Sequence, residues 1–147
     1  RILRMSGSPY SLACGFACGA SVSFTPFIGF HLILGAVLAY LLRGNILASW
    51  IGTLVGNPWT FPFILVLINK VGVFITPFFG FDILFSMSDS SGLYSFIITQ
   101  LFPMALGGAI VSIFVWPIIF TICYFLIIGW RKHKIKRKSR KKIYEKY

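Results

Sequence analysis

Charge is scarce in this chain of 147 residues. Charged residues make up 12% of it, and only three of them are acidic against fourteen Lys and Arg. So little charge, beside a hydrophobic fraction of 57%, excludes an ordinary soluble domain. It indicates that lipid solvates most of the chain. The length predicts a single domain.

The shortage of acids also excludes most kinds of catalytic site. No paired carboxylates, nucleophile elbow, phosphate-binding loop or dinucleotide-binding glycine motif occurs in the sequence. The three cysteines are too few for a zinc site, which usually takes four ligands. We therefore expect no enzymatic activity, no catalytic residue, no bound metal and no cofactor.

Two apolar arms, residues 10–24 and 27–42, flank a break at Thr25-Pro26. An arm of sixteen residues makes about 24 Å of helix, which is shorter than the hydrocarbon core of about 30 Å. We predict a re-entrant helical hairpin whose tip lies in protein or in a wet cavity, because lipid satisfies no free backbone groups. Two short but complete spans are the alternative.

A second break follows at Asn57-Pro58, with Pro62 four residues later. The residue before a proline is pushed out of the α region, so this site predicts a second proline-broken hairpin. Longer apolar stretches near residues 59–79 and 103–130 predict at least two transmembrane helices. The expected fold class is therefore an all-α, polytopic membrane protein.

The cations gather at the end of the chain, where ten of the fourteen Lys and Arg lie between Arg131 and Lys146. We divide the chain into a membrane domain, 1–130, and a basic tail, 131–147. The positive-inside rule places the tail in the cytoplasm. Anionic headgroups are its expected partner, at about 1 kcal/mol per charge near the surface, and no specific nucleic-acid partner is expected.

Small residues predict close helix packing. Gly15 and Gly19 form a small-xxx-small pattern, which lets helix backbones approach each other in lipid. The other residues assigned a structural role are those that break a helix or begin one: Pro26, Gly29, Asn45, Pro58 and Pro62.

Polar residues near the breaks are the candidates for a substrate path. His31 lies close to the predicted hairpin tip, where it either serves function or hydrogen-bonds backbone freed by the break. Arg43 either snorkels to the membrane surface as an anchor or holds an anionic group.

The remaining path candidates lie around the second break and in the span that follows. Asn57 and Thr60 either satisfy the loosened backbone or coordinate a passing solute. Lys70 lies midway through a predicted span, where it needs a partner, and it is an interfacial anchor if the span is shifted.

Four motifs together resemble one bacterial family. They are Gly15-Phe16-Ala17-x-Gly19, Pro26-x-x-Gly29-x-His31, Arg43-x-Asn45 and Asn57-Pro58-x-Thr60-x-Pro62. The chain resembles the family named domain of unknown function 2062. The resemblance implies a multi-pass protein of the bacterial inner membrane and supplies no mechanism. Such domains also occur fused to glycosyltransferases, which implies a link to envelope metabolism.

Two hypotheses for function follow. The first is transport or flipping of an anionic solute or lipid. The second is a non-catalytic membrane scaffold or assembly partner for an envelope enzyme. A single copy of this size has little room for an enclosed path, so a homo-oligomer is also considered.

Overall fold

The computed structural model describes residues 7–27, 29–80 and 92–144, and within these ranges all regular structure is helical. The expected all-α class is confirmed for this part of the chain. Residues 81–91, which lie between the two predicted spans, fall outside the described residues. The charged residues that lie outside them are Arg1, Arg4, Asp82, Asp89, Glu145 and Lys146.

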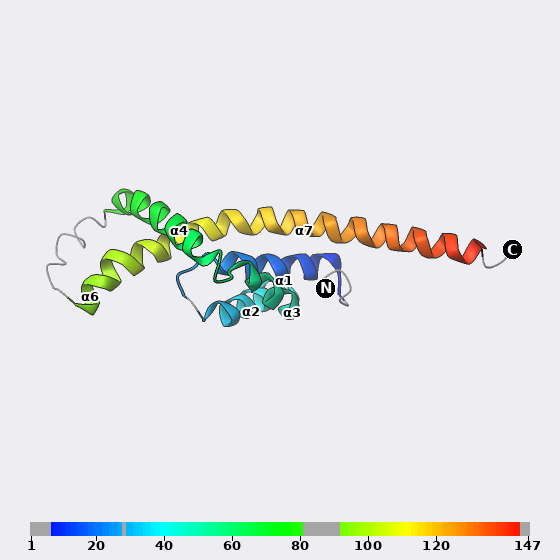
Figure 1. The fold of residues 1–147 in the computed structure, drawn as a ribbon, viewed down its shortest axis with the longest axis horizontal. Coiled ribbons are helices and arrows are strands. Elements are labelled where there is room, and N and C mark those ends of the chain that lie inside the picture. The colour runs from blue at the N-terminus through cyan, green and yellow to red at the C-terminus, as the bar shows by residue number, and fades with distance from the viewer. Residues whose placement is uncertain (1–6, 28, 81–91, 145–147) are drawn as a thin grey trace.

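Helices α1 (Pro9–Val22) and α2 (His31–Leu41) are the two arms around the first break. Helix α1 begins where the Ser8 hydroxyl accepts the Ser11 N–H, with a proline in the first turn. The two helices pack side by side (Figure 1). The Tyr10 hydroxyl donates to the carbonyl of Leu42 at 3.3 Å, so the start of α1 lies beside the end of α2.

Helix α3 (Ile46–Gly52), extended by the 3-10 turn η2 (Thr53–Val55), lies against both α1 and α2. Its backbone approaches α1 so closely that a side chain at either of two glycines would collide with it. A Cβ on Gly15 would meet the carbonyl of Asn45, and one on Gly19 would meet that of Ser49. The three helices therefore form one tightly packed unit.

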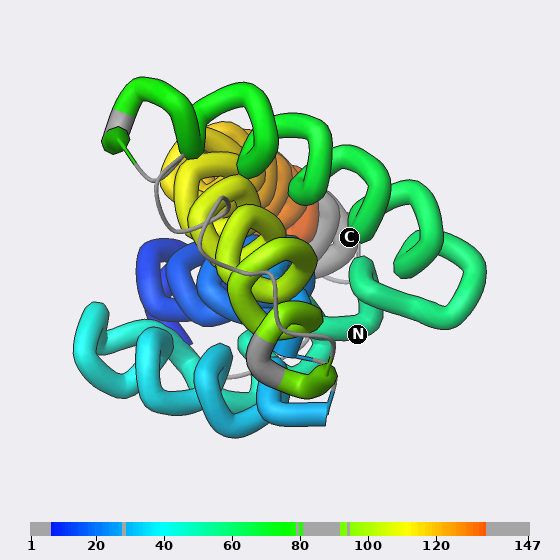
Figure 2. The backbone as a smooth tube through the Cα atoms, turned by 90° about the vertical axis from the view of Figure 1, so that its left-hand side faces the viewer, coloured from blue at the N-terminus to red at the C-terminus, as the bar shows by residue number. Residues whose placement is uncertain are grey.

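Helix α4 (Phe61–Ile75), followed by the 3-10 turn η3 (Thr76–Phe79), packs on α7 and not on α3. Figure 2 shows α4 on one side of α7 and the α2–α3 pair on the other side, beyond α1. The two helices that flank Asn57-Pro58 thus have different partners. The expectation of a second hairpin at this break is wrong for the described residues, because the chain passes from one packing unit to another there.

Helix α7 (Phe102–Tyr144) is the longest element, and it is preceded by α6 (Leu93–Phe96) and the π-helical turn η4 (Ile97–Leu101). Its 43 residues make about 65 Å of helix. It continues unbroken through the expected boundary at residue 130, so the basic segment begins as part of the last helix. In Figure 1 it projects well beyond the other helices.

Among the described residues, two helical stretches, Phe61–Phe78 and Ile97–Lys134, are long and apolar enough to cross a membrane. They correspond in position to the two spans predicted from the sequence. Length and composition alone support this assignment, and both point to a membrane location.

Candidate functional site

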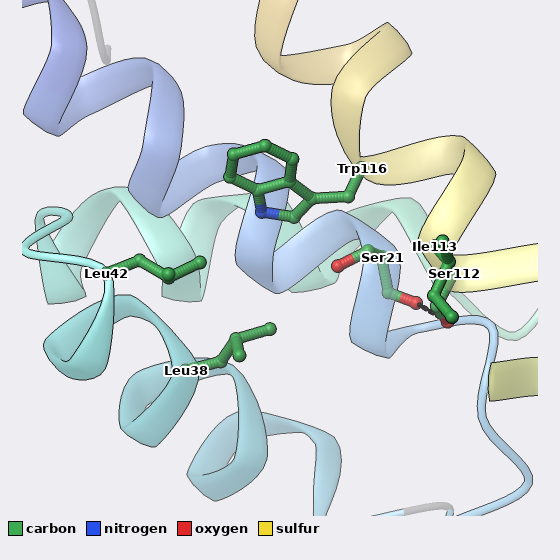
Figure 3. Close-up of a pocket in the computed structure, with 6 residues that line it drawn as sticks. All are labelled: Ser21, Leu38, Leu42, Ser112, Ile113 and Trp116. Atoms are coloured by element: carbon green, nitrogen blue, oxygen red, sulfur yellow. Dashed lines mark hydrogen bonds between the residues drawn. The ribbon is translucent and has the colours of Figure 1, made fainter.

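A groove of about 370 Å³ lies between α2 and α7, with α1 as its floor (Figure 3). Its volume falls within the range of about 300–1,000 Å³ that is usual for ligand sites. Side chains from three helices line it, namely Ser21, Leu38, Leu42, Ser112, Ile113 and Trp116.

The groove is apolar because its two serines are occupied by the helices themselves. The Ser112 hydroxyl donates to the carbonyl of Ser21 at 2.7 Å, and the Ser21 hydroxyl donates to the carbonyl of Cys18 at 3.0 Å. Neither hydroxyl has a proton left to donate to a ligand. The surface therefore suits a hydrocarbon chain better than a polar solute.

Aromatic contacts fix the α7 wall of the groove. The indole N–H of Trp116 donates to the sulfur of Cys18 at 3.3 Å. The Trp116 ring stacks on Phe120 with 5.2 Å between centroids, and Phe120 meets Tyr10 edge-on at 5.6 Å. The groove thus has a defined wall between the middle of the bundle and the end where α1 begins.

Arg43 follows directly on the groove residue Leu42 and has a left-handed backbone with φ of 55°. Two hydrogen bonds close the end of α2 around it. The N–H of Arg43 donates to Tyr40, and that of Gly44 donates to Ala39 at 2.7 Å. This is a Schellman ending, in which the left-handed residue is usually glycine. An L-residue there costs about 1–2 kcal/mol.

The neighbouring Gly44 does not take the left-handed conformation, because close packing needs its missing side chain. A Cβ on Gly44 would lie 2.8 Å from the backbone nitrogen of Gly15. The next residue, Asn45, donates its N–H to the carbonyl of Ser11 at 2.8 Å. The close contact with α1 thus requires a glycine at position 44, and Arg43 takes the strained left-handed position.

The Arg43 side chain is exposed, and no carboxylate occurs in residues 7–27, 29–80 and 92–144. A second cation lies at this end of the bundle, because the Arg131 guanidinium donates to the carbonyl of Gly7 at 2.6 Å. Within the described part of the chain nothing neutralises Arg43.

His31 lies at the opposite end of α2 and is partly buried. Its Nδ1 accepts the N–H of Gly29 at 3.2 Å, and its ring meets Phe61 edge-on with 6.1 Å between centroids. Gly29 has a φ of 93°, which suits glycine in the turn that follows Pro26. His31 therefore closes the turn between α1 and α2.

Asn57 and Thr60 close the second break in the same self-contained way. The Asn57 side-chain oxygen accepts the N–H groups of Trp59 and Thr60, at 2.9 and 3.0 Å. The Thr60 hydroxyl accepts the Asn57 N–H and donates to the carbonyl of Val55. Pro62 then lies in the first turn of α4, where its missing N–H costs nothing.

The five path candidates do not converge on one site. His31 lies near Phe61, directly after Thr60, whereas Arg43 lies at the other end of α2. Lys70 is exposed on α4, and α4 lies on the far side of α7 from α2 (Figure 2). Only Arg43 adjoins the groove. The groove-lining Leu38 and Trp116 had no signal in the sequence beyond their apolar character.

Comparison with known proteins identifies a family. A family model described as "Uncharacterized protein conserved in bacteria (DUF2062)" matches residues 1–136, which confirms the resemblance seen in the motifs. No curated protein matches the chain, and no solved structure does.

Proposed function

The chain belongs to this family of uncharacterized bacterial proteins, and we propose that it is a polytopic inner-membrane protein that binds an anionic phospholipid beside α2. An acyl chain lies in the groove, and the phosphate rests on Arg43. One observation carries this proposal. An arginine with an exposed side chain occupies a strained backbone position, usually glycine's, directly after the groove residue Leu42.

Two tyrosines support a position for Arg43 at the depth of the headgroups. Tyr10, which bonds Leu42, and Tyr124 both contact the ring of Phe120, and tyrosines favour the membrane–water interface. Measured from Tyr124 along α7, Ser112 lies about 18 Å deeper. The groove therefore lies inside a hydrocarbon core of about 30 Å.

The same measure of depth, counted along α7 from Tyr124, supports a re-entrant hairpin. Gly108 approaches the carbonyl of Phe24, just before the Pro26 break. It lies sixteen residues from Tyr124, which is about 24 Å of helix. The turn between α1 and α2 therefore stops short of the far boundary of a core about 30 Å thick. The positive-inside rule favours a cytoplasmic position for the basic end of α7 and, with it, for the Arg43 end of the groove.

Lipid retention tests the proposal. The protein is reconstituted in liposomes of phosphatidylglycerol and phosphatidylcholine and extracted in a neutral detergent, and mass spectrometry measures the retained lipids. We expect about tenfold enrichment of phosphatidylglycerol, since a hydrogen bond to a charged group contributes about 1.5–3 kcal/mol.

The matched variants are Arg43→Gly and Lys70→Met. Arg43→Gly should remove most of the enrichment while keeping the left-handed helix end, because glycine favours that conformation. Lys70→Met removes a cation away from the groove and should leave the enrichment unchanged. Equal enrichment in the wild type and in Arg43→Gly would exclude the proposed site.

Flipping of the bound lipid is the further step that the transport hypothesis requires. The groove extends into the core, which supports entry of a chain but not by itself passage of a headgroup. A flipping assay in proteoliposomes with a labelled anionic lipid tests this step. A rate unchanged in the double variant Arg43→Gly, His31→Phe would exclude a role for both residues in transport.

The scaffold hypothesis draws support from the end of α7. Residues 131–144 continue the helix for about 21 Å, which exceeds the Debye length of about 8 Å at physiological ionic strength. Anionic headgroups at the start of this segment therefore hardly attract the cations of its last turns. These cations are available to an acidic cytoplasmic partner. Crosslinking should recover such a partner with the whole chain and not after truncation at residue 131. Recovery of the protein alone in both cases would exclude this role.

A further inference from the structure

A second apolar groove lies on the other side of α2. It has a volume of about 420 Å³ and lies between α2 and α3. The residues that line it are Leu32, Ile33, Ala36, Val37 and Trp50. Helix α2 is thus flanked by two grooves of similar size, one shared with α7 and one shared with α3.

The first groove begins at the end of α2 that carries Arg43, whereas the α2 lining of the second groove ends at Val37, six residues before Arg43, which is about 9 Å of helix. On the α7 side, Tyr10 bonds the carbonyl of Leu42. On the α3 side, Tyr40 lies one helical turn from Ala36, and its side chain is 73% exposed. Tyr10 thus lies at the Arg43 end of the first groove, and Tyr40 lies along α2 between Val37 of the second groove and Arg43, positions that suit the interface between chains and headgroups.

The length of α2 matches one leaflet. Its eleven residues make about 16 Å of helix, and half of the hydrocarbon core is about 15 Å. An acyl chain that starts at Arg43 therefore reaches Leu32, the deepest residue of the second groove, within its own leaflet. The first groove covers a similar depth, from Leu42 to Ser112.

We propose that the ligand is an anionic glycerophospholipid with two acyl chains that straddles α2, with one chain in each groove and the phosphate on Arg43. This inference rests on the proposed function. Lipid tails are as apolar as the groove, so burial alone gives little preference between a lipid with one acyl chain and a lipid with two. Two chains joined by one glycerol do give a preference, because seating the second chain becomes an intramolecular step.

The test compares phosphatidylglycerol carrying two oleoyl chains with its one-chain lyso form, in mixed detergent micelles, by native mass spectrometry. The wild type should retain the two-chain lipid about tenfold better. Ala36→Trp fills the second groove and should bring this ratio close to one. Leu34→Trp, on the same helix but in neither groove, should keep the wild-type ratio.

Arg43→Gly separates this inference from the proposed function. It should lower retention of both anionic forms to the level of phosphatidylcholine. If Ala36→Trp keeps the wild-type ratio while Arg43→Gly abolishes anionic preference, the straddling arrangement is wrong and the lipid site stands. If Arg43→Gly changes nothing, the site itself is wrong. Val37→Trp, also in the second groove, replaces Ala36→Trp if circular dichroism shows that the latter does not fold.

Discussion

The two ends of α2 use the same backbone device in opposite ways. At the His31 end the left-handed residue is Gly29, and an added Cβ there would meet nothing within 4 Å. At the other end Gly44 is needed for contact with α1, and the left-handed residue is Arg43. One turn uses glycine where strain would arise, and the other holds a cation in the strained position.

The polar groups at the two ends also differ in whether they bind other groups of the protein. His31 accepts a backbone N–H from its own turn, and the nearby Asn57 and Thr60 satisfy the second break. Arg43 is exposed and has no acid beside it among the described residues. Polar residues at a break in an apolar chain thus need not form a path. An exposed cation on strained backbone beside an apolar groove is the better indication of a ligand site.

The largest expected effect comes from the packing that holds both ends of α2 in place. Gly19→Leu should abolish the folded state, because the new side chain collides with the backbone of Ser49 and Thr53, which rotamer changes cannot relieve. Gly129→Leu is the control, since an added Cβ there meets nothing within 4 Å. Thermal melts in detergent followed by circular dichroism measure the difference, and equal midpoints would contradict this packing.

Arg43→Gly should change stability in opposite directions with and without lipid. Without lipid the variant should be more stable by about 1 kcal/mol, since glycine relieves the left-handed strain. With phosphatidylglycerol the wild type should gain stability and the variant should not, because only a ligand that binds the folded state stabilises it. Thermal melts with and without the lipid measure both effects. A lipid-induced gain of equal size in the variant would place the binding elsewhere.

A smaller effect is expected at the second break. Thr60→Val removes the hydroxyl that bonds Val55 and Asn57 while keeping the shape of the side chain. The expected cost is about 1 kcal/mol of folding free energy, seen as a lower melting midpoint, with lipid retention unchanged. A fall in lipid retention without loss of stability would give Thr60 a ligand-binding role.

The smallest effect is expected from His31→Phe. The variant loses the acceptor for the Gly29 N–H but keeps an aromatic ring against Phe61, so a cost of about 0.5 kcal/mol is expected. Melting and lipid retention are the two measurements, and retention should match the wild type. A loss of lipid retention as large as that in Arg43→Gly would show that both ends of α2 take part in lipid binding.

The sequence predicted the local features of the unit formed by α1, α2 and α3. Asn45 begins α3, where its side chain accepts the N–H of Ala48 at 3.0 Å, and Gly15 and Gly19 lie where two backbones meet. These features depend on single residues and their neighbours, so residue type and spacing are enough to indicate them. Pro26 likewise lies in the turn between the two predicted arms.

Other features depend on contacts between distant segments and could not be predicted. Only the contact of Gly44 with Gly15 shows why the left-handed position is taken by Arg43 and not by the glycine beside it. The groove brings together residues far apart in the chain, and its wall residue Trp116 bonds Cys18, 98 residues away. The second hairpin was wrong for the same reason, since α4 finds its partner in α7.

The most direct test of the lipid site is photocrosslinking in liposomes. A phosphatidylglycerol with a diazirine in one acyl chain is activated, and the labelled peptides are mapped by mass spectrometry. We expect adducts concentrated on Leu38, Leu42 and Trp116 in the wild type and lost in Arg43→Gly. Adducts spread equally over exposed α4 residues such as Phe63 and Phe74, in both proteins, would contradict a specific lipid site beside α2.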